Sequence, residues 1–197
     1  MKKIKQQSDD SLYANRAMGA MIFAFFGGGW IVLWSILAFP GNFIVPSGIE
    51  LCAVAIFVLA LKRFRRYKGA LVAEKNSPHR RKVKRLFLII NTIQWISISI
   101  GLIVLANIGQ GAWSIPLVIL VMGLHFLPLA HVFANPPHYL TGFAIIVIAL
   151  TYPFLFHGGP INPIGCLGTG LVLWASAFWA LRTQSGIQVS GNTVVDL

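Results

Sequence analysis

The chain has 197 residues, of which 56% are hydrophobic and only 11% are charged. Soluble domains carry about 25% charged residues, so this composition excludes an ordinary water-soluble domain. The net charge of +11 would suggest nucleic acid as the partner of a soluble protein. Here the basic residues gather in a few segments between long apolar runs. Those runs predict an all-α fold, a polytopic bundle of transmembrane helices.

Six apolar segments approach the length of about 20 residues that a helix needs to cross the hydrocarbon. Turns rich in Gly, Pro and Asn separate most of them, and one long basic loop lies at 62–85. We expect this loop to continue the second span as an interfacial helix that Ser77-Pro78 breaks. The predicted spans are 17–39, 43–61, 86–106, 114–134, 139–156 and 163–181. The domain organisation is then a segment at 1–16, a six-helix domain at 17–181 and a tail at 182–197. We expect no cleaved signal, because no apolar core precedes residue 17.

The basic residues predict how the chain is threaded, since Lys and Arg crowd the cytoplasmic loops of membrane proteins. With the N-terminus inside, the inner segments hold all 16 Lys and Arg residues, and the outer loops hold none. These inner segments are 1–16, 62–85, 135–138 and 182–197. A bundle of five or seven spans would place Arg182 or the 62–85 loop on the wrong side. The sequence therefore predicts a multi-pass protein of the cytoplasmic membrane, with both termini cytoplasmic.

The same threading explains the basic loop without nucleic acid. Anionic lipid attracts each nearby basic side chain with about 1 kcal/mol. We expect the lipid bilayer as the surroundings and anionic head groups at the cytoplasmic face as partners, and a protein partner or a homo-oligomer stays open. The predicted head-group contacts are Lys62, Arg63, Arg65, Arg66, Arg80, Arg81, Lys82, Lys84 and Arg85.

Small residues predict where the helices approach closely, because membrane helices associate through close packing. Ala20, Ala24 and Gly28 recur at four-residue spacing in the first span, and Gly165 and Gly170 stand in the sixth. The GGGW run is read either as a packing surface or as a break in the first helix. The two halves of the chain have opposite topology, as in inverted-repeat transporters, but no repeat relates their sequences.

Ionisable residues inside a membrane are costly, so each is a functional candidate. Glu50 is the only acid in any span. It lies about 18 Å above Lys62, in the outer half of the membrane, by the rise of about 1.5 Å per helical residue. One interpretation is a proton or cation site. The other is a carboxyl group that is wetted from outside or bonded to a neighbour.

A second set of polar residues lies near the middle of the membrane. His125 and Gln94 have similar depths in adjacent spans, and Asn91 shares a helix face with Gln94. We expect a hydrogen bond between His125 and Gln94. The candidate intramembrane polar site is Glu50, Asn91, Gln94 and His125. It is either a path for a solute or a proton, or a set of bonds between helices worth about 0.6 kcal/mol each.

The remaining histidines and the cysteines predict no metal and no cofactor. His131 follows His125 by a spacing that turns it about 120° around the helix, so the two cannot form a metal pair on one face. His131 and His138 are read as interfacial residues near the cytoplasmic face. Cys52 and Cys166 form no CxxC motif and are predicted to be buried packing residues.

The stretch Gly-Leu-His-Phe-Leu-Pro-Leu-Ala at 123–130 resembles a motif of small, uncharacterised bacterial integral membrane proteins. The short basic N-terminus, the Gly- and Trp-containing first span and the chain length are also similar. Such families are domains of unknown function. The resemblance implies a helical membrane fold and no particular chemistry.

These observations favour a membrane protein without enzymatic activity that lets a small solute or a proton permeate through an intramembrane polar site. One alternative is a non-transporting accessory or immunity-type protein that acts through a partner or lipid. A second alternative is an intramembrane enzyme.

Overall fold

The computed structural model describes residues 2–73, 78–133 and 135–182. Within these ranges it contains six helices that are long and apolar enough to cross a membrane, and no strand. They are α1 (Lys2–Ala38), α2 (Ile44–Ala73), α3 (Pro78–Asn107), α4 (Ser114–Val132), α5 (Pro137–Leu155) and α6 (Ile164–Arg182), with short 3-10 turns η1 (Gly111–Trp113) and η2 (Gly159–Ile161). The predicted all-α fold with six spans is confirmed.

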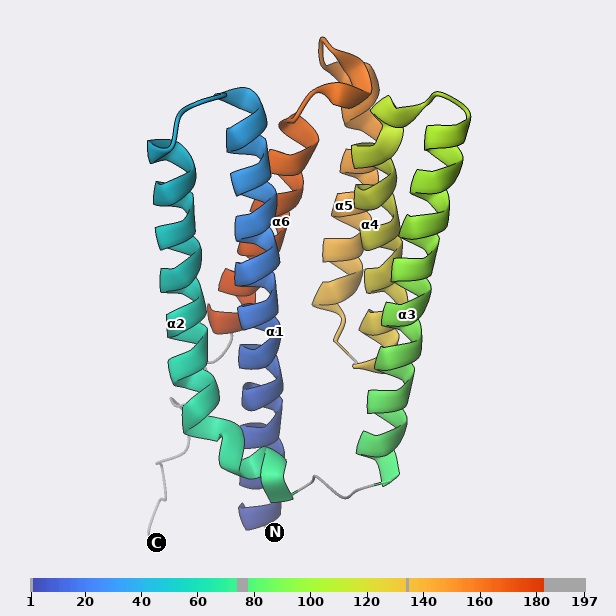
Figure 1. Cartoon of the computed structure of the whole chain (residues 1–197). Helices are drawn as coiled ribbons and strands as arrows, with labels where there is room; N and C mark the ends of the chain where they lie inside the picture. The colour runs from blue at the N-terminus through green and yellow to red at the C-terminus, as the bar shows by residue number, and fades with distance from the viewer. Residues whose placement is uncertain (1, 74–77, 134, 183–197) are drawn as a thin grey trace, which may run out of the picture.

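Three of the helices are much longer than a membrane requires. α4, α5 and α6 have 19 residues each, or about 28 Å, close to the hydrocarbon thickness. α1, α2 and α3 have 37, 30 and 30 residues and project further at one end of the bundle (Figure 1). The described Lys and Arg residues all lie toward this end, which we call the basic end.

The helical extensions include most of the predicted basic loop and of the predicted N-terminal segment. The predicted continuation of the second span as a helix is confirmed, because α2 runs on to Ala73, and a new helix, α3, begins at Pro78. The predicted N-terminal segment is part of α1, which begins at Lys2. Residues 74–77 and most of the predicted tail, 183–197, lie outside the described residues.

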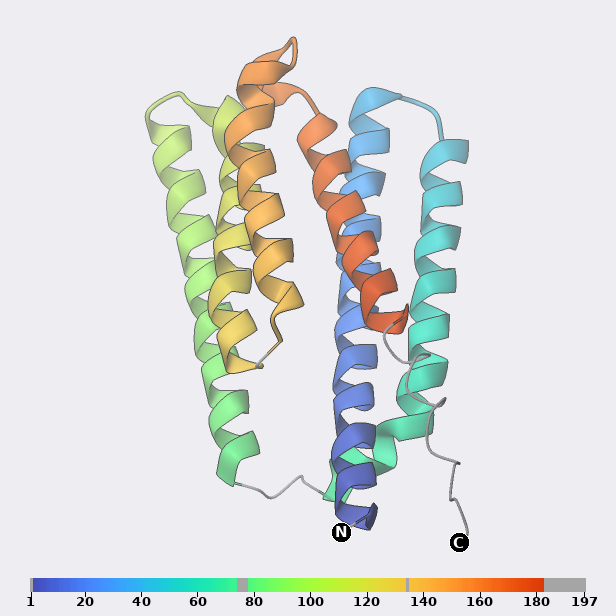
Figure 2. The same cartoon turned by 180° about the vertical axis from the view of Figure 1, so that it is seen from behind.

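The helices form two groups of three. In one group α1 packs against α2 and α6, and in the other α4 packs against α3 and α5. The two groups meet mainly where α6 packs against α5 and, less extensively, α4. We call this contact the seam. Figures 1 and 2 show α2 and α3 at opposite edges of the bundle, with the other four helices between them. The groups do not correspond to the two halves of the sequence, because α6 belongs to the group of α1 and α2, and α3 belongs to the group of α4 and α5.

Small residues allow the close contacts within each group, as predicted. A Cβ atom added at Gly170 of α6 would lie 2.7 Å from the carbonyl oxygen of Gly27 in α1. One added at Gly142 of α5 would lie 2.9 Å from the carbonyl oxygen of Gly123 in α4. α1 continues as a helix through its three glycines, so they are not a break. Gly27 packs against α6 and Gly28 packs against α2. Backbones this close gain dispersion contacts that larger side chains would prevent.

The basic end is joined by contacts between its helical extensions. The Tyr13 and Tyr67 rings of α1 and α2 lie 5.4 Å apart between centroids. The Arg63 guanidinium of α2 donates a hydrogen bond to the carbonyl oxygen of Leu181, in the last turn of α6. Carbonyls at a helix C-terminus lack helical partners and carry partial negative charge. Arg63, predicted to contact head groups, therefore has a protein partner.

Candidate functional site

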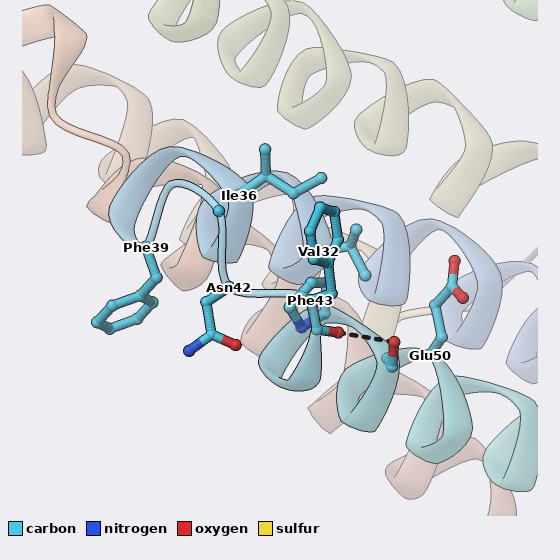
Figure 3. A pocket seen from close by; sticks show the side chains of 9 residues that line it. Val32, Ile36, Phe39, Asn42, Phe43 and Glu50 are labelled. Carbon is cyan, nitrogen blue, oxygen red and sulfur yellow. Dashed lines mark hydrogen bonds between the residues drawn. The ribbon is translucent and has the colours of Figure 1, made fainter.

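The structure places Glu50 apart from the other three predicted site residues. It lines a hollow formed by the end of α1, the following turn and the start of α2 (Figure 3). α2 packs against α1, and α1 separates it from the group that contains His125. The four predicted residues therefore do not form one site.

His125 does face α3, but not through the predicted bond. Its ring lies beside the main chain of Ile90, one helical turn from Gln94 toward the basic end. No hydrogen bond joins His125 to Gln94 in the described structure, and the Nδ1 atom of His125 is buried without a partner there. The predicted depth of His125 relative to the residues of α3 was thus wrong by about one helical turn. Asn91 and Gln94 are half-buried on α3.

His138 lies deeper in the bundle than predicted. His131 is exposed, in agreement with an interfacial position. The half-buried His138 ring instead lies 5.4 Å from the Phe23 ring of α1 and 6.2 Å from the Phe126 ring of α4. The Asn135 amide nitrogen is 3.3 Å from its ring nitrogens. His138 therefore links the two groups of helices at the basic end of the seam.

A pair of hydroxyl groups bridges the seam above His138. The Oγ1 atom of Thr141 in α5 and the Oγ atom of Ser176 in α6 lie 2.8 Å apart. Thr141 also approaches the Pro137 carbonyl oxygen at 3.1 Å, and Ser176 approaches that of Val172 at 2.8 Å. Each hydroxyl has a single proton. One hydroxyl must therefore donate across the seam while the other donates to its own helix.

A third hydroxyl on the seam has no partner among the described residues. Thr169 of α6 is fully buried, and its Oγ1 atom forms no hydrogen bond with the part of the chain that is described. It shares a helix face with Gly165 and Ser176, which both contact α5. Cys166, also fully buried, lies one turn further from the basic end. We call Cys166, Thr169, Ser176, Thr141 and His138 the seam residues.

Apolar side chains close the seam around these groups. Ile119, Ile145 and Leu173, from α4, α5 and α6, are almost completely buried. At the end opposite the basic residues, the Tyr152 ring covers Gly165, and its hydroxyl donates to the Pro160 carbonyl oxygen at 3.1 Å. The Thr169 hydroxyl thus lies between Tyr152 on one side and the Thr141–Ser176 pair on the other.

The cysteines differ from each other, which corrects the prediction for one of them. Cys166 is buried as expected, whereas Cys52 is exposed on α2, because α2 packs against α1 alone among the larger helix contacts. In the described ranges, no three His, Cys, Asp or Glu residues lie close enough together to hold a metal ion.

The predicted head-group contacts fall on the helical extensions. Apart from Arg63, those with described side chains are exposed: Lys62, Arg65, Arg66, Arg81, Lys82, Lys84 and Arg85. The Arg66 guanidinium also lies 5.7 Å from the centre of the Tyr67 ring. The Arg80 side chain is outside the described residues.

Comparison with known proteins gives no match to a family model, to a curated protein or to a solved structure. Functional inference therefore rests on this chain's own residues. Sequence reasoning missed the three seam hydroxyls. The available signal was the glycine-rich face of the sixth span, since a hydroxyl in register with close-packed glycines must also be buried.

Proposed function

We propose that the protein transfers a proton or a small neutral polar solute across a bacterial cytoplasmic membrane, along the seam between its two groups of helices. The observation that carries this proposal is the buried, unpartnered Thr169 hydroxyl. A buried hydroxyl without a hydrogen bond costs about 1–3 kcal/mol, and nearly all such groups have partners. A water molecule or solute that enters the seam in another conformation supplies the missing partner.

The position of Thr169 between two closures supports alternating access. Opening the basic end separates Thr141 from Ser176, and opening the other end moves Tyr152 away from Gly165. The hydroxyl pair has a low cost of separation, because a hydrogen bond between membrane helices is worth about 0.6 kcal/mol. Rocking of two helical groups around a central site is a known form of transport motion. With the positive-inside rule, the basic end is cytoplasmic.

The chemistry of the seam favours a neutral solute or a proton carried along water. Hydroxyl groups both donate and accept hydrogen bonds, and among the described seam residues none carries a fixed charge. An ion would lose its hydration without a compensating charge, at a cost of several kcal/mol. A water chain bonded to Thr169 and Ser176 keeps a proton solvated throughout.

Flux into proteoliposomes tests the proposal. Proton entry is followed with an internal pH-sensitive dye, and urea or glycerol entry is followed by light scattering after osmotic shock. Thr169→Val replaces the hydroxyl by a methyl group of similar size, and we expect at least a tenfold lower flux. Thr151→Val is the matched control, because Thr151 is exposed and its hydroxyl bonds the Val147 carbonyl of its own helix.

Two results would contradict transport along the seam. One is wild-type flux no greater than that of empty liposomes for protons, urea and glycerol. The other is equal flux in the wild type and the Thr169→Val variant.

The exposed basic extensions support a second candidate, an accessory protein that binds a partner or anionic lipid. Arg81, Lys82 and Lys84 project from the start of α3 as exposed side chains. In this account, replacing all three by Gln removes a co-purifying protein or reduces binding to anionic vesicles, while Thr169→Val changes neither. Seam transport predicts the reverse pattern, with flux lost only in Thr169→Val.

A further inference from the structure

The hollow that contains Glu50 is separate from the seam and has its own chemistry. It lies between the last turns of α1 and the first turns of α2, at the end of the bundle opposite the basic residues, and has a volume of about 310 Å³. Val32 and Ile36 of α1 line it with Phe43 and Pro46 of the turn region. Figure 3 shows the carboxylate of Glu50 at one side of these apolar walls, away from Asn42.

The other polar side chains of the hollow are engaged in local structure. The Asn42 side-chain oxygen accepts hydrogen bonds from the backbone N–H groups of Ile44 and Val45, at 3.0 and 3.2 Å. It thereby caps the start of α2. The Ser47 hydroxyl donates to the Phe43 carbonyl oxygen at 2.7 Å. Among the side chains that line the hollow, the exposed Glu50 carboxylate is the one charged group.

The Glu50 side chain is exposed and has no counter-charge among the described residues. It has no hydrogen bond or ion pair with any described residue. The next basic residue along α2, Lys62, is about 18 Å away along the helix axis. A second copy of the chain carries its described Lys and Arg residues at the same end, so a parallel dimer does not supply a cation either. A charged group in this region of a membrane requires a partner or contact with water.

The hollow opens near the ends of α1 and α2 that lie opposite the basic end, within reach of lipid head groups. Glu50 lies about 9 Å along α2 from its first residue, and Trp34 lies about 6 Å from the end of α1. The two helices are antiparallel and joined by a short turn, so these residues have similar depths. Tryptophan is characteristic of the head-group level. Large apolar side chains beside the hollow, such as Phe43 and Leu51, are exposed by 81% and 71% and offer a surface to an acyl chain.

We propose that this hollow binds the primary ammonium group of an amphiphile, with Glu50 as its ion-pair partner and the apolar tail along the outside of α1 and α2. An ammonium group needs one carboxylate and donates charge-assisted hydrogen bonds to it. A calcium ion takes six to eight oxygen ligands, which one carboxylate and two engaged side chains do not supply. The ammonium comes from the ethanolamine head group of a phospholipid or from a free long-chain amine.

Native mass spectrometry of the detergent-solubilised full chain tests this site. The protein is titrated with phosphatidylethanolamine, phosphatidylcholine and phosphatidylglycerol of identical acyl chains, and separately with dodecylammonium. We expect phosphatidylethanolamine to bind at least tenfold more tightly than the other two lipids. Glu50→Gln reduces its affinity at least tenfold, and Glu50→Asp retains it within threefold.

Two controls separate a lost site from a damaged fold. Ser47→Ala removes a polar group of the same hollow without removing charge, and we expect unchanged binding. Thermal unfolding shows whether Glu50→Gln remains folded. Thr169→Val should also bind normally, so the site and the seam can fail independently.

The ligand arms distinguish the source of the ammonium group. Selective phosphatidylethanolamine binding that depends on Glu50 identifies a lipid site. Dodecylammonium binding that depends on Glu50, without such lipid selectivity, identifies a site for free amines. If Glu50→Gln and wild-type protein bind both ligands equally, the proposal is wrong.

Discussion

The seam and the α3–α4 contact each contain a polar atom that is buried without a partner, but the two atoms have different surroundings. Thr169 is fully buried where the two groups of helices meet. The His125 side chain is half-buried within one group, beside the main chain of Ile90. A polar atom within one packed group requires only a small side-chain adjustment to find a partner. One between two groups acquires a partner when the groups separate.

The largest expected effect tests the packing of α6 against α1. This contact positions α6, which forms the seam with α5. Gly170→Val places a side chain against the Gly27 carbonyl oxygen, 2.7 Å from the added Cβ atom. Overpacking costs about 1–3 kcal/mol where side chains can move, and a helix backbone yields less. We expect loss of the monodisperse protein in size-exclusion chromatography.

Gly168→Ala is the control for that substitution. Its added Cβ atom meets only the Ile148 side chain, at 3.3 Å, and a small adjustment accommodates it. Equal behaviour of the two variants would show that the close approach of α1 and α6 is not required.

The second prediction compares the two unpartnered atoms directly. Thr169→Val removes a buried hydroxyl without a hydrogen bond, so we expect the resting state to gain about 1–2 kcal/mol of stability while flux falls at least tenfold. His125→Leu should leave flux within twofold of the wild type. Unfolding in denaturing detergent measures the first quantity, and proteoliposome flux measures the second. A destabilised Thr169→Val variant would indicate that the hydroxyl has a partner in the resting state.

The third prediction concerns the hydrogen bond that joins α2 to the end of α6. Arg63→Gln removes a charged donor from the Leu181 carbonyl oxygen, and we expect a loss of about 1 kcal/mol at the helix terminus. Arg65→Gln is the control, because Arg65 is exposed nearby on the same helix, and it should change stability by less than about 0.5 kcal/mol. Thermal unfolding of the two purified variants measures these losses of stability. Equal losses in Arg63→Gln and Arg65→Gln would show that Arg63 acts only through lipid.

The smallest expected effect is the energy of the hydroxyl pair itself. A double-mutant cycle with Thr141→Val and Ser176→Ala should give a coupling of about 0.6 kcal/mol, the average for hydrogen bonds between membrane helices. Unfolding of the wild type, the two single variants and the double variant measures it. A coupling above about 2 kcal/mol would make the pair a fixed structural contact and would argue against a seam that opens readily.

The fold could be predicted from the sequence because it depends on the lengths of apolar runs. Six such runs correspond to six helices. The predicted limits of the last three spans agree with the structure to within three residues, whereas the first three spans extend five to eight residues further at the basic end. The continuation of the second span as a helix into the basic segment was predicted from the sequence. The helical start of α3 before its apolar run was not, because basic residues indicate which side of a membrane they occupy but not whether they are helical.

The site was harder to predict because it depends on which helices are neighbours. Glu50 and His125 both lie in apolar helices, α2 and α4. Nothing in those two segments of sequence shows that α1 lies between α2 and the group that contains α4. Ser176 and Ser99 both lie among apolar residues of a predicted span, so their sequence contexts are similar. Ser99 is exposed, whereas Ser176 lies in the contact of α6 with α5. His138 follows two prolines in a turn, which indicated an interface, although its ring reaches Phe23 between the groups.

The central claim, that the seam opens during transport, is tested most directly by locking it. Thr141→Cys and Ser176→Cys are combined with Cys52→Ser and Cys166→Ser, and a disulfide is then formed between the two new cysteines. The hydroxyl oxygens they replace are 2.8 Å apart, so the bond needs little backbone movement. We predict that oxidation stops the flux of protons or neutral solutes in proteoliposomes and that reduction restores it. Undiminished flux with the disulfide fully formed would contradict transport along the seam.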